Sequence, residues 1–294
     1  MAITTFCKTS RSIDVDEFID YVESEIDLNE DDSIISAATM LQALANNQKI
    51  LIDTFNRDLL KYNIEAGASY SQSSSILGVG KNKSFVVRAN MWPSVAPTKL
   101  KTIENTLFSY ELPHNHNFSF LTANYFGPGY ETDIWECAEP KNLRGTIGEK
   151  VTIRFLERTK LDPGKQMFFR RQKDIHVQLP PEEFSMSLNL LAMTEQDQIT
   201  DQFEFNIKNN CITGFPGGTM CSKRVFLMNI AGKIGDEETV DILLRIAADH
   251  PCQRTRGAAL ASAINISPII ANRIGKNIKD DESPFIQEVL KSGT

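Results

Sequence analysis

The stretch "ELPHNHNFSFLTANYF", residues 111–126, places two histidines directly before a run rich in aromatic and apolar side chains. The chain has only four histidines among 294 residues, and His114 and His116 are two of them. On a β-strand, residues i and i+2 point to the same face, so both imidazoles would lie on one side of a sheet. Two neutral rings this close can share a metal ion. The stretch therefore predicts a strand with part of a metal site; the alternative is a pair of surface histidines in a loop after Pro113.

The sequence on both sides of this stretch is typical of an all-β unit. Short runs that favour strands alternate with Gly, Pro and Asn turns between residues 67 and 208. Many short strands at close spacing predict a sandwich or a barrel. The runs are "SFVVRANMW", "FSYEL", "FSFLTANYF", "DIWECA", "KVTIRFLERT", "KQMFFRRQ", "DIHVQL" and "FSMSLNLLAM".

The two ends of the chain are predicted to be helical. Apolar residues recur at helical spacing in both, and Asp14 and Asp236 stand where helix caps are expected. The sequence thus predicts three segments: an N-terminal helical segment over 1–66, a β-barrel over 67–208 and a C-terminal helical segment over 209–294. The last begins with a connector punctuated by Gly and Pro.

The C-terminal segment resembles HEAT-type helical repeats. The residues that carry this resemblance are a Gly-Asp turn, a Leu-Leu pair on the following helix, and an arginine, alanines and a leucine on the next one, all within residues 233–268. Such repeats bury their apolar faces against neighbours, so we expect this segment to pack on the barrel, on the N-terminal helices or on a second subunit of a homodimer. His250 lies at a predicted helix end, where it would interact with the helix dipole rather than with a metal.

Composition narrows the classes of partner. A net charge of −7 and a pI near 5.3 argue against nucleic-acid binding. No apolar run is long enough to cross a membrane, and residues 1–14 lack a signal-peptide core, so we expect a cytoplasmic protein. Five scattered cysteines without a C-x-x-C spacing predict free thiols rather than disulfides or a zinc knuckle.

A third histidine completes the candidate metal site. His176 lies in "RRQKDIHVQLPPEEF", 60 residues after His116 and shortly after "LDPGK". With its H-N-H pair, its "DPG" before the last histidine and Asn189 after it, the chain resembles the cupin superfamily, whose motifs contain H-x-H and then P-x-G, His and Asn. The resemblance implies a double-stranded β-helix (jelly-roll) barrel within an α+β protein, and a metal held by His114, His116 and His176.

One cupin ligand is missing from its usual place. The glutamate that the family carries a few residues after H-x-H is replaced by Phe120 or Leu121, and Glu131 is a later candidate. In this respect the chain resembles the three-histidine thiol dioxygenases, typified by cysteine dioxygenase. Those enzymes carry a carboxylate-binding arginine about 26 residues before the H-x-H pair, and Arg88 stands 26 residues before His114.

The chain departs from the thiol dioxygenases in the strand after the third histidine. The segment "DIHVQLPPEEFSMSLNLL" resembles the family's passage into an S-L-x-L strand. There the family carries a histidine and a tyrosine of an outer-sphere triad, whereas this chain has Asn189 and Leu191. The resemblance therefore implies a related three-histidine iron site that acts on a substrate other than cysteine.

Three neutral imidazoles leave open positions on an octahedral ion, which suits Fe(II) with an anionic, chelating substrate and O₂. Arg88 could bind the substrate carboxylate, as could Arg170 or Arg171; the alternative for each is a solvated surface side chain. Tyr125 and Tyr130 could orient O₂ or a substrate hydroxyl, or could pack in the core.

These residues favour a mononuclear non-haem Fe(II)-dependent oxygenase that acts on a small amino-acid-like, carboxylate-bearing molecule. Two alternatives remain open from the sequence. One is a cupin with non-oxidative metal chemistry, such as an isomerase or a decarboxylase. The other is a binding or scaffold protein without catalysis.

Overall fold

The structure, a computed structural model, describes residues 3–60, 71, 73–95, 107–270 and 274–292. It divides into two compact units, the first formed by the chain up to Pro140 with Thr152–Glu195, the second by Lys141–Val151 with the chain from Gln196 on. Helices and antiparallel strands are both present, which confirms the predicted mixture. None of the described helices combines the length and the apolar character that a membrane span needs.

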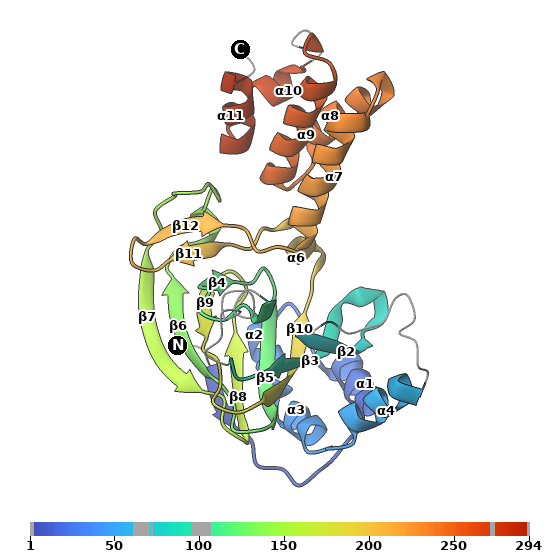
Figure 1. The fold of residues 1–294 in the computed structure, drawn as a ribbon, viewed down its shortest axis with the longest axis vertical. Helices are drawn as coiled ribbons and strands as arrows, with labels where there is room; N and C mark the ends of the chain where they lie inside the picture. Colours follow the sequence, from blue (N-terminus) through green and yellow to red (C-terminus); the bar gives the residue numbers. More distant parts are fainter. Residues whose placement is uncertain (1–2, 61–70, 72, 96–106, 271–273, 293–294) are drawn as a thin grey trace. The chain divides into compact units, whose positions relative to one another are not determined.

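Two antiparallel sheets form the framework of the first unit (Figure 1). The first sheet has the strand order β1-β8-β5-β10-β3-β2, and the part of the second sheet in this unit has the order β4-β9-β6-β7. The strands are β1 (Ile3–Phe6), β2 (Ser74–Val79), β3 (Phe85–Trp92), β4 (His114–Asn115), β5 (Ser119–Phe126), β6 (Glu131–Cys137), β7 (Ile153–Lys160), β8 (Lys165–Phe169), β9 (Asp174–Gln178) and β10 (Ser185–Ala192).

An aromatic-rich core lies between these two sheets. It contains Trp92, Phe120 and Leu191 from the first sheet and Ile134 from the second. The described strands of this unit pair only within their own sheet, so the prediction of a closed barrel is wrong and the arrangement is a sandwich. Large side chains from both inner faces fill the space between the sheets. The core is therefore enclosed without hydrogen bonds that would join the edges of the two sheets.

Helices cover the other face of the first sheet. They are α1 (Val15–Glu25), α2 (Asp31–Ser36), α3 (Ala38–Ala45) and α4 (Ile50–Leu60). Alternate residues of β3, such as Phe85 and Val87, share one core with Phe18 and Leu41 of these helices. Asp14 caps α1 as predicted, accepting a hydrogen bond of 2.8 Å from the Glu17 amide. The predicted segment 1–66 thus shares its core with the strands. The helices that cover the first sheet therefore belong to the same unit as the sheet.

Three local predictions differ from the structure. Strands β1 and β2 lie where no strand was expected, and "FSYEL" turns instead of extending. The turn has a backbone cause, because Ser109 and Glu111 have φ angles of 55° and 58°, outside the β region. Between them, Tyr110 makes only an isolated bridge to Gln178.

The second unit combines a short hairpin with helices. The hairpin of β11 (Glu204–Asn206) and β12 (Cys211–Gly214) begins inside the predicted barrel segment and ends in the predicted connector. The helices are α6 (Glu195–Ile199), α7 (Met220–Ile234), α8 (Glu237–Asp249), α9 (Gln253–Ile266), α10 (Lys276–Lys279) and α11 (Pro284–Ser292). Asp236 caps α8 as predicted, with its Oδ1 3.0 Å from the Thr239 amide. Helices α7, α8 and α11 all pack on α9, and the HEAT resemblance stays a prediction.

The shared core of α1 and the first sheet gives a stability prediction. Phe18 is fully buried, so Phe18→Ala should lower the free energy of unfolding of the first unit by about 3–5 kcal/mol. Urea unfolding followed by tryptophan fluorescence measures this, because Trp92 and Trp135 both belong to the first unit. The control is Phe6→Ala in β1, where the ring is 66% exposed and the loss should stay below about 1 kcal/mol. Equal losses for the two variants would contradict the shared core.

Candidate metal centre

The pairing of β4 with β9 brings the predicted histidines together. His114 lies directly opposite His176 in this antiparallel pair. Side chains directly opposite each other project from the same face of a sheet with their Cβ atoms about 5 Å apart. His116 follows β4 and reaches the same face two residues on, so segments 60 residues apart in the chain supply one cluster.

The three rings face one another at metal-binding distances. Their centroids are 4.9 Å apart for His114 and His116, 4.6 Å for His114 and His176, and 5.0 Å for His116 and His176. One nitrogen from each ring lies within 4.8 Å of the others. Nitrogen atoms bound to one ion at about 2.0–2.1 Å are held within this range, so the donor set fits a metal.

Hydrogen bonds on the outer nitrogens orient two of the rings. His114 Nδ1 lies 2.8 Å from the Leu112 carbonyl oxygen, to which it donates, and this leaves Nε2 free to act as a ligand. His176 Nδ1 lies 2.6 Å from the side-chain amide of Gln178. When His176 Nε2 binds a metal, Nδ1 carries the ring proton and donates it to the amide oxygen. His176 Nε2 is buried and has no hydrogen-bond partner among the described residues. An orphaned buried nitrogen is costly, and coordination of a metal would satisfy it.

The surroundings favour the neutral form of two of the imidazoles, which is the form that binds metals. Burial lowers the pKa of His114, and burial together with the two neighbouring histidines lowers the pKa of His176 well below its ordinary value. His114 and His176 are 8% and 2% exposed. These two rings therefore need no proton release before an ion binds.

Aromatic side chains line the cluster. The ring of Phe120 lies 5.2 Å from that of His116, and the ring of Phe169 lies 4.8 Å from that of His176. Phe118 stacks on His116 at 4.7 Å, and these two residues are partly exposed, whereas Phe120, Phe169, His114 and His176 are buried. An apolar lining limits competing water and strengthens electrostatic interactions inside the site.

No carboxylate joins the histidine cluster among the described residues. Phe120, one of the two residues predicted to stand in place of the glutamate, contributes a ring near His116. Glu131 is exposed at the beginning of β6, on the opposite face from Thr132 and Ile134, so it does not join the histidines. The described donor set is three imidazoles.

Arg88 points into the same interior from the first sheet. In the register of the sheet, Arg88 lies opposite Asn189 of β10, and Asn189 lies opposite Thr122 of β5. Thr122 is two residues along β5 from Phe120. Two residues span about 7 Å along a strand, so Arg88 lies one layer from the aromatic lining of the histidines. Arg88 is partly exposed. Burial lowers its pKa to about 10, and its Nε has no hydrogen-bond partner among the described residues.

Polar side chains form a layer around Arg88. Burial raises the pKa of Tyr130, while the hydroxyls of Thr122 and Ser187 and the charge of Arg88 lower it less strongly. Trp92 donates to the Ser187 hydroxyl at 3.0 Å, and its ring lies 4.4 Å from that of Tyr130. The layer presents a protonated phenol next to a guanidinium.

A glycine sets the position of Tyr130. Gly129, directly before it, has a φ of 82°, and a Cβ there would lie 1.9 Å from the Leu161 carbonyl oxygen. Only glycine tolerates both the positive φ and this close approach, so the turn that feeds Tyr130 into the interior depends on it.

Three other predicted site residues are not brought to the histidines. Arg170 is held by Asp174 and Glu136 in ion pairs of 2.5 Å and 3.1 Å. Arg171 donates to the Leu28 carbonyl at 3.2 Å and to the Thr194 hydroxyl at 3.2 Å. Their partners already satisfy these two guanidinium groups, which corrects the prediction that either binds a substrate carboxylate.

Tyr125 belongs to the opposite face of the first sheet. It packs in the core beneath the helices, and its hydroxyl donates to the Asn47 carbonyl at 3.2 Å. Tyr125 and Phe120 differ by an odd number of residues along β5, so their side chains leave opposite faces. The prediction that Tyr125 acts at the site is corrected accordingly.

Gln178 was missed by sequence reasoning. It lies two residues after His176 on β9, and i, i+2 spacing on a strand places both on one face. That spacing was a usable signal, since metal-bound histidines commonly use their second nitrogen to hydrogen-bond a polar neighbour.

Comparisons with known proteins add slight likenesses only. No protein-family model and no curated protein matches the chain. Among solved structures, DMSP lyase DddQ from Ruegeria pomeroyi DSS-3 is similar with 12% identity and a TM-score of 0.30, over 74% of this chain and 84% of that one. Hydroquinone 1,2-dioxygenase PnpCD in complex with Cd²⁺ and 4-hydroxybenzonitrile is similar with 11% identity and a TM-score of 0.28, over 47% and 71%.

Two further likenesses cover smaller shares of the other chains. The match to a structure of the DMSP lyases RdDddP and RnDddQII spans half of that chain and 44% of this one, with 12% identity and a TM-score of 0.26. Salicylate 1,2-dioxygenase from Pseudoaminobacter salicylatoxidans with gentisate is matched at 10% identity and a TM-score of 0.27, over 49% and 31%. At these scores the likenesses assign neither a family nor an activity to the chain.

The orphaned nitrogen of His176 predicts metal dependence. His176→Ala should abolish binding of one Fe(II) per chain, because two imidazoles alone do not hold the ion. His250→Ala, which removes the chain's fourth histidine, should bind as the wild type does. Metal per chain is measured by elemental analysis after anaerobic loading and desalting. Retention of the metal by the His176 variant would disprove the site.

The amide beside His176 predicts a smaller effect. Gln178→Ala should weaken metal affinity by about 10–100-fold, because the ring loses the contact that orients it. A competition titration with a chelator of known affinity measures the change. Gln172→Ala is a control, since only its backbone is seen to contact this segment.

Proposed function

We propose that this protein is a mononuclear non-haem Fe(II)-dependent oxygenase that acts on a small, amino-acid-like, carboxylate-bearing substrate. The observation that carries the proposal is a cluster of three imidazoles that share one face beside a guanidinium whose Nε lacks a described partner. When bound, Fe(II) supplies one-electron chemistry toward O₂ and coordination positions that three protein ligands leave open.

The charge of the site favours an anion. Three neutral ligands leave the full charge of a divalent ion, and Arg88 adds a positive charge in the same interior. A buried cation without a counter-ion is costly to the free protein. A substrate carboxylate would relieve that cost, because a guanidinium binds a carboxylate through two parallel hydrogen bonds.

The same layer offers an acceptor for an amino group. Asn90 lies two residues after Arg88 on β3, on the same face of the strand. Its Oδ1 is buried and has no hydrogen-bond partner among the described residues. A donor array and an acceptor about 7 Å apart along the strand suit a carboxylate and an ammonium group of one molecule, which supports the amino-acid-like class.

Tyr130 holds a proton beside the proposed carboxylate. Because burial raises its pKa, the phenol stays protonated at neutral pH and can donate a hydrogen bond to an anionic substrate. The rings of Phe118, Phe120 and Phe169 exclude water on the metal side. The chain's own residues thus bind, orient and desolvate the substrate.

Arg88→Met tests the anion site. The substitution keeps side-chain length but removes the donors, and we expect the KM for the active substrate to rise by about 10–100-fold with Fe(II) content unchanged. Arg158→Met is the matched control, because Arg158 pairs with Asp133 and is 56% exposed. Oxygen consumption by the Fe(II)-loaded protein with a panel of amino acids and related carboxylates is the measurement.

Other outcomes of the same assay distinguish the alternatives. Conversion of a panel compound without oxygen uptake would replace the oxygenase proposal with non-oxidative metal chemistry. Failure to retain any divalent metal would overturn both the oxygenase and the non-oxidative metal enzyme. The remaining alternative would then be a binding protein without catalysis. An Arg88 variant that binds Fe(II) and keeps the wild-type KM would overturn the assignment of Arg88 alone.

A further inference from the structure

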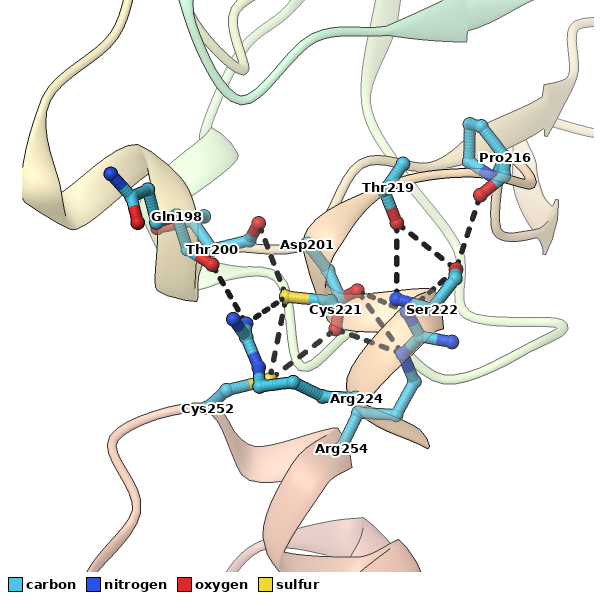
Figure 2. Close-up of polar contacts among 10 residues, drawn as sticks. All are labelled: Gln198, Thr200, Asp201, Pro216, Thr219, Cys221, Ser222, Arg224, Cys252 and Arg254. Carbon is cyan, nitrogen blue, oxygen red and sulfur yellow. Dashed lines mark hydrogen bonds and ion pairs between the residues drawn. The ribbon is translucent and has the colours of Figure 1, made fainter. Parts of the chain in front are cut away.

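A second cluster of reactive groups lies in the second unit, where two helices begin. Cys221 is the second residue of α7, and Cys252 is the N-cap residue of α9. Their Sγ atoms are 3.7 Å apart, and the two residues are 1% and 5% exposed (Figure 2). Residues 31 positions apart therefore present a buried pair of thiols in contact.

Charged side chains surround the pair. Arg224 places a guanidinium nitrogen 2.9 Å from Cys221 Sγ (Figure 2). Asp201 lies with Oδ2 3.9 Å from Cys252 Sγ, and Arg254 binds this carboxylate through Nε and a terminal nitrogen at 3.1 Å and 2.6 Å. Two guanidinium groups and one carboxylate leave a surplus of one positive charge, which a single thiolate neutralises.

From this geometry we propose that Cys221 and Cys252 are a peroxide-sensitive dithiol, oxidised by hydrogen peroxide to an intramolecular disulfide. Cys252 is the attacking thiolate and Cys221 is the resolving thiol. The site is independent of the three histidines and of the proposed oxygenase reaction.

The reaction balances in two steps. The Cys252 thiolate attacks one oxygen of the peroxide, an S–O bond forms, and the O–O bond breaks with release of hydroxide. The Cys221 sulfur then attacks the sulfenic sulfur, the S–O bond breaks, and the thiol proton of Cys221 leaves with that hydroxyl group as water. The two sulfurs together lose two electrons, which reduce the peroxide.

The surroundings decide which sulfur attacks. The hydrogen bond from the Cys221 thiol, with smaller contributions from Thr255, lowers the pKa of Cys252 to about 6 against the opposing effects of burial and of the Asp201 carboxylate. The same hydrogen bond and burial raise the pKa of Cys221, so Cys221 keeps its proton. A thiolate at a helix N-terminus next to a neutral thiol is the arrangement of an attacking and a resolving cysteine.

A metal ion fits this cluster less well, although the two sulfurs and Asp201 have ligand spacing. Arg224 contacts one of the three donor residues and Arg254 contacts another. A divalent cation would have to displace both guanidinium groups or lie against them, whereas disulfide formation needs only a short approach of two sulfurs that already touch.

Peptide mapping tests the proposal on the full-length protein. Reduced protein, freed of metal with a chelator, is exposed to stoichiometric hydrogen peroxide, quenched with N-ethylmaleimide and digested without reductant. We expect one cross-link, between Cys221 and Cys252, the loss of two of the five alkylatable thiols, and reversal by dithiothreitol. Earlier oxidation of Cys7, Cys137 or Cys211, or cross-links between chains, would overturn the proposal.

Two variants and one control assign the roles. In Cys221→Ser, peroxide should leave a sulfenic acid on Cys252 that dimedone labels, and in Cys252→Ser no label should form on Cys221. Cys137→Ser removes an equally buried thiol from the first unit and should keep the cross-link. Dimedone labelling of Cys221 rather than Cys252 would reverse the assigned roles and overturn them.

Wild-type protein provides a readout that does not depend on how the variants fold. Alkylation of Cys252 by iodoacetamide should reach half of its maximal rate near pH 6, as expected from its lowered pKa. A midpoint near the ordinary thiol value would contradict an attacking thiolate. Stoichiometric zinc that binds the reduced protein and blocks alkylation of both cysteines would replace the dithiol with a metal site.

Discussion

The register between β4 and β9 is the constraint on which the candidate metal centre depends. His114 contributes to the cluster only because it stands directly opposite His176, and a slip of one residue would turn one ring to the other face of the sheet. Strand β4 is only two residues long, so its pairing alone is weak. The Gln172 amide reinforces it by donating to the His116 carbonyl at 2.6 Å, and β6 pairs with β9 on its other side.

The interior of the sandwich combines two environments that seldom lie so close together. Beside the histidines it is aromatic, and burial there lowers the pKa of His114 and His176 and leaves His176 Nε2 without a described partner. One layer away it is polar, with Arg88 and Tyr130 near each other. Unsatisfied groups of this kind reduce stability, and proteins tend to carry such costs at binding or catalytic sites. Under the proposed function, a metal ion on one side and an anionic substrate on the other would relieve both costs.

The second unit uses helix ends in a comparable way. The N-terminus of a helix stabilises negative charge, and two of them meet at the thiol pair together with Arg224. In each unit a cluster of titratable groups is enclosed and oriented by contacts with backbone or with neighbouring side chains, so its reactivity depends on packing as much as on residue type.

The sequence by itself determined the type of most elements and the three histidines that form the candidate metal centre. Alternation and turn residues located strands such as 85–92 and 119–126, and the caps Asp14 and Asp236 were readable because they act within one turn of chain. Only the tertiary structure decided whether the sheet closes and which face of β5 looks inward. Both faces of β5 are buried, one under helices and one in the sandwich, so alternation could separate Tyr125 from Phe120 without saying which of them meets the histidines. Likewise, packing between distant segments brings Arg170 to Glu136, Arg171 to Leu28 and Cys221 to Cys252, and no local pattern encodes these contacts.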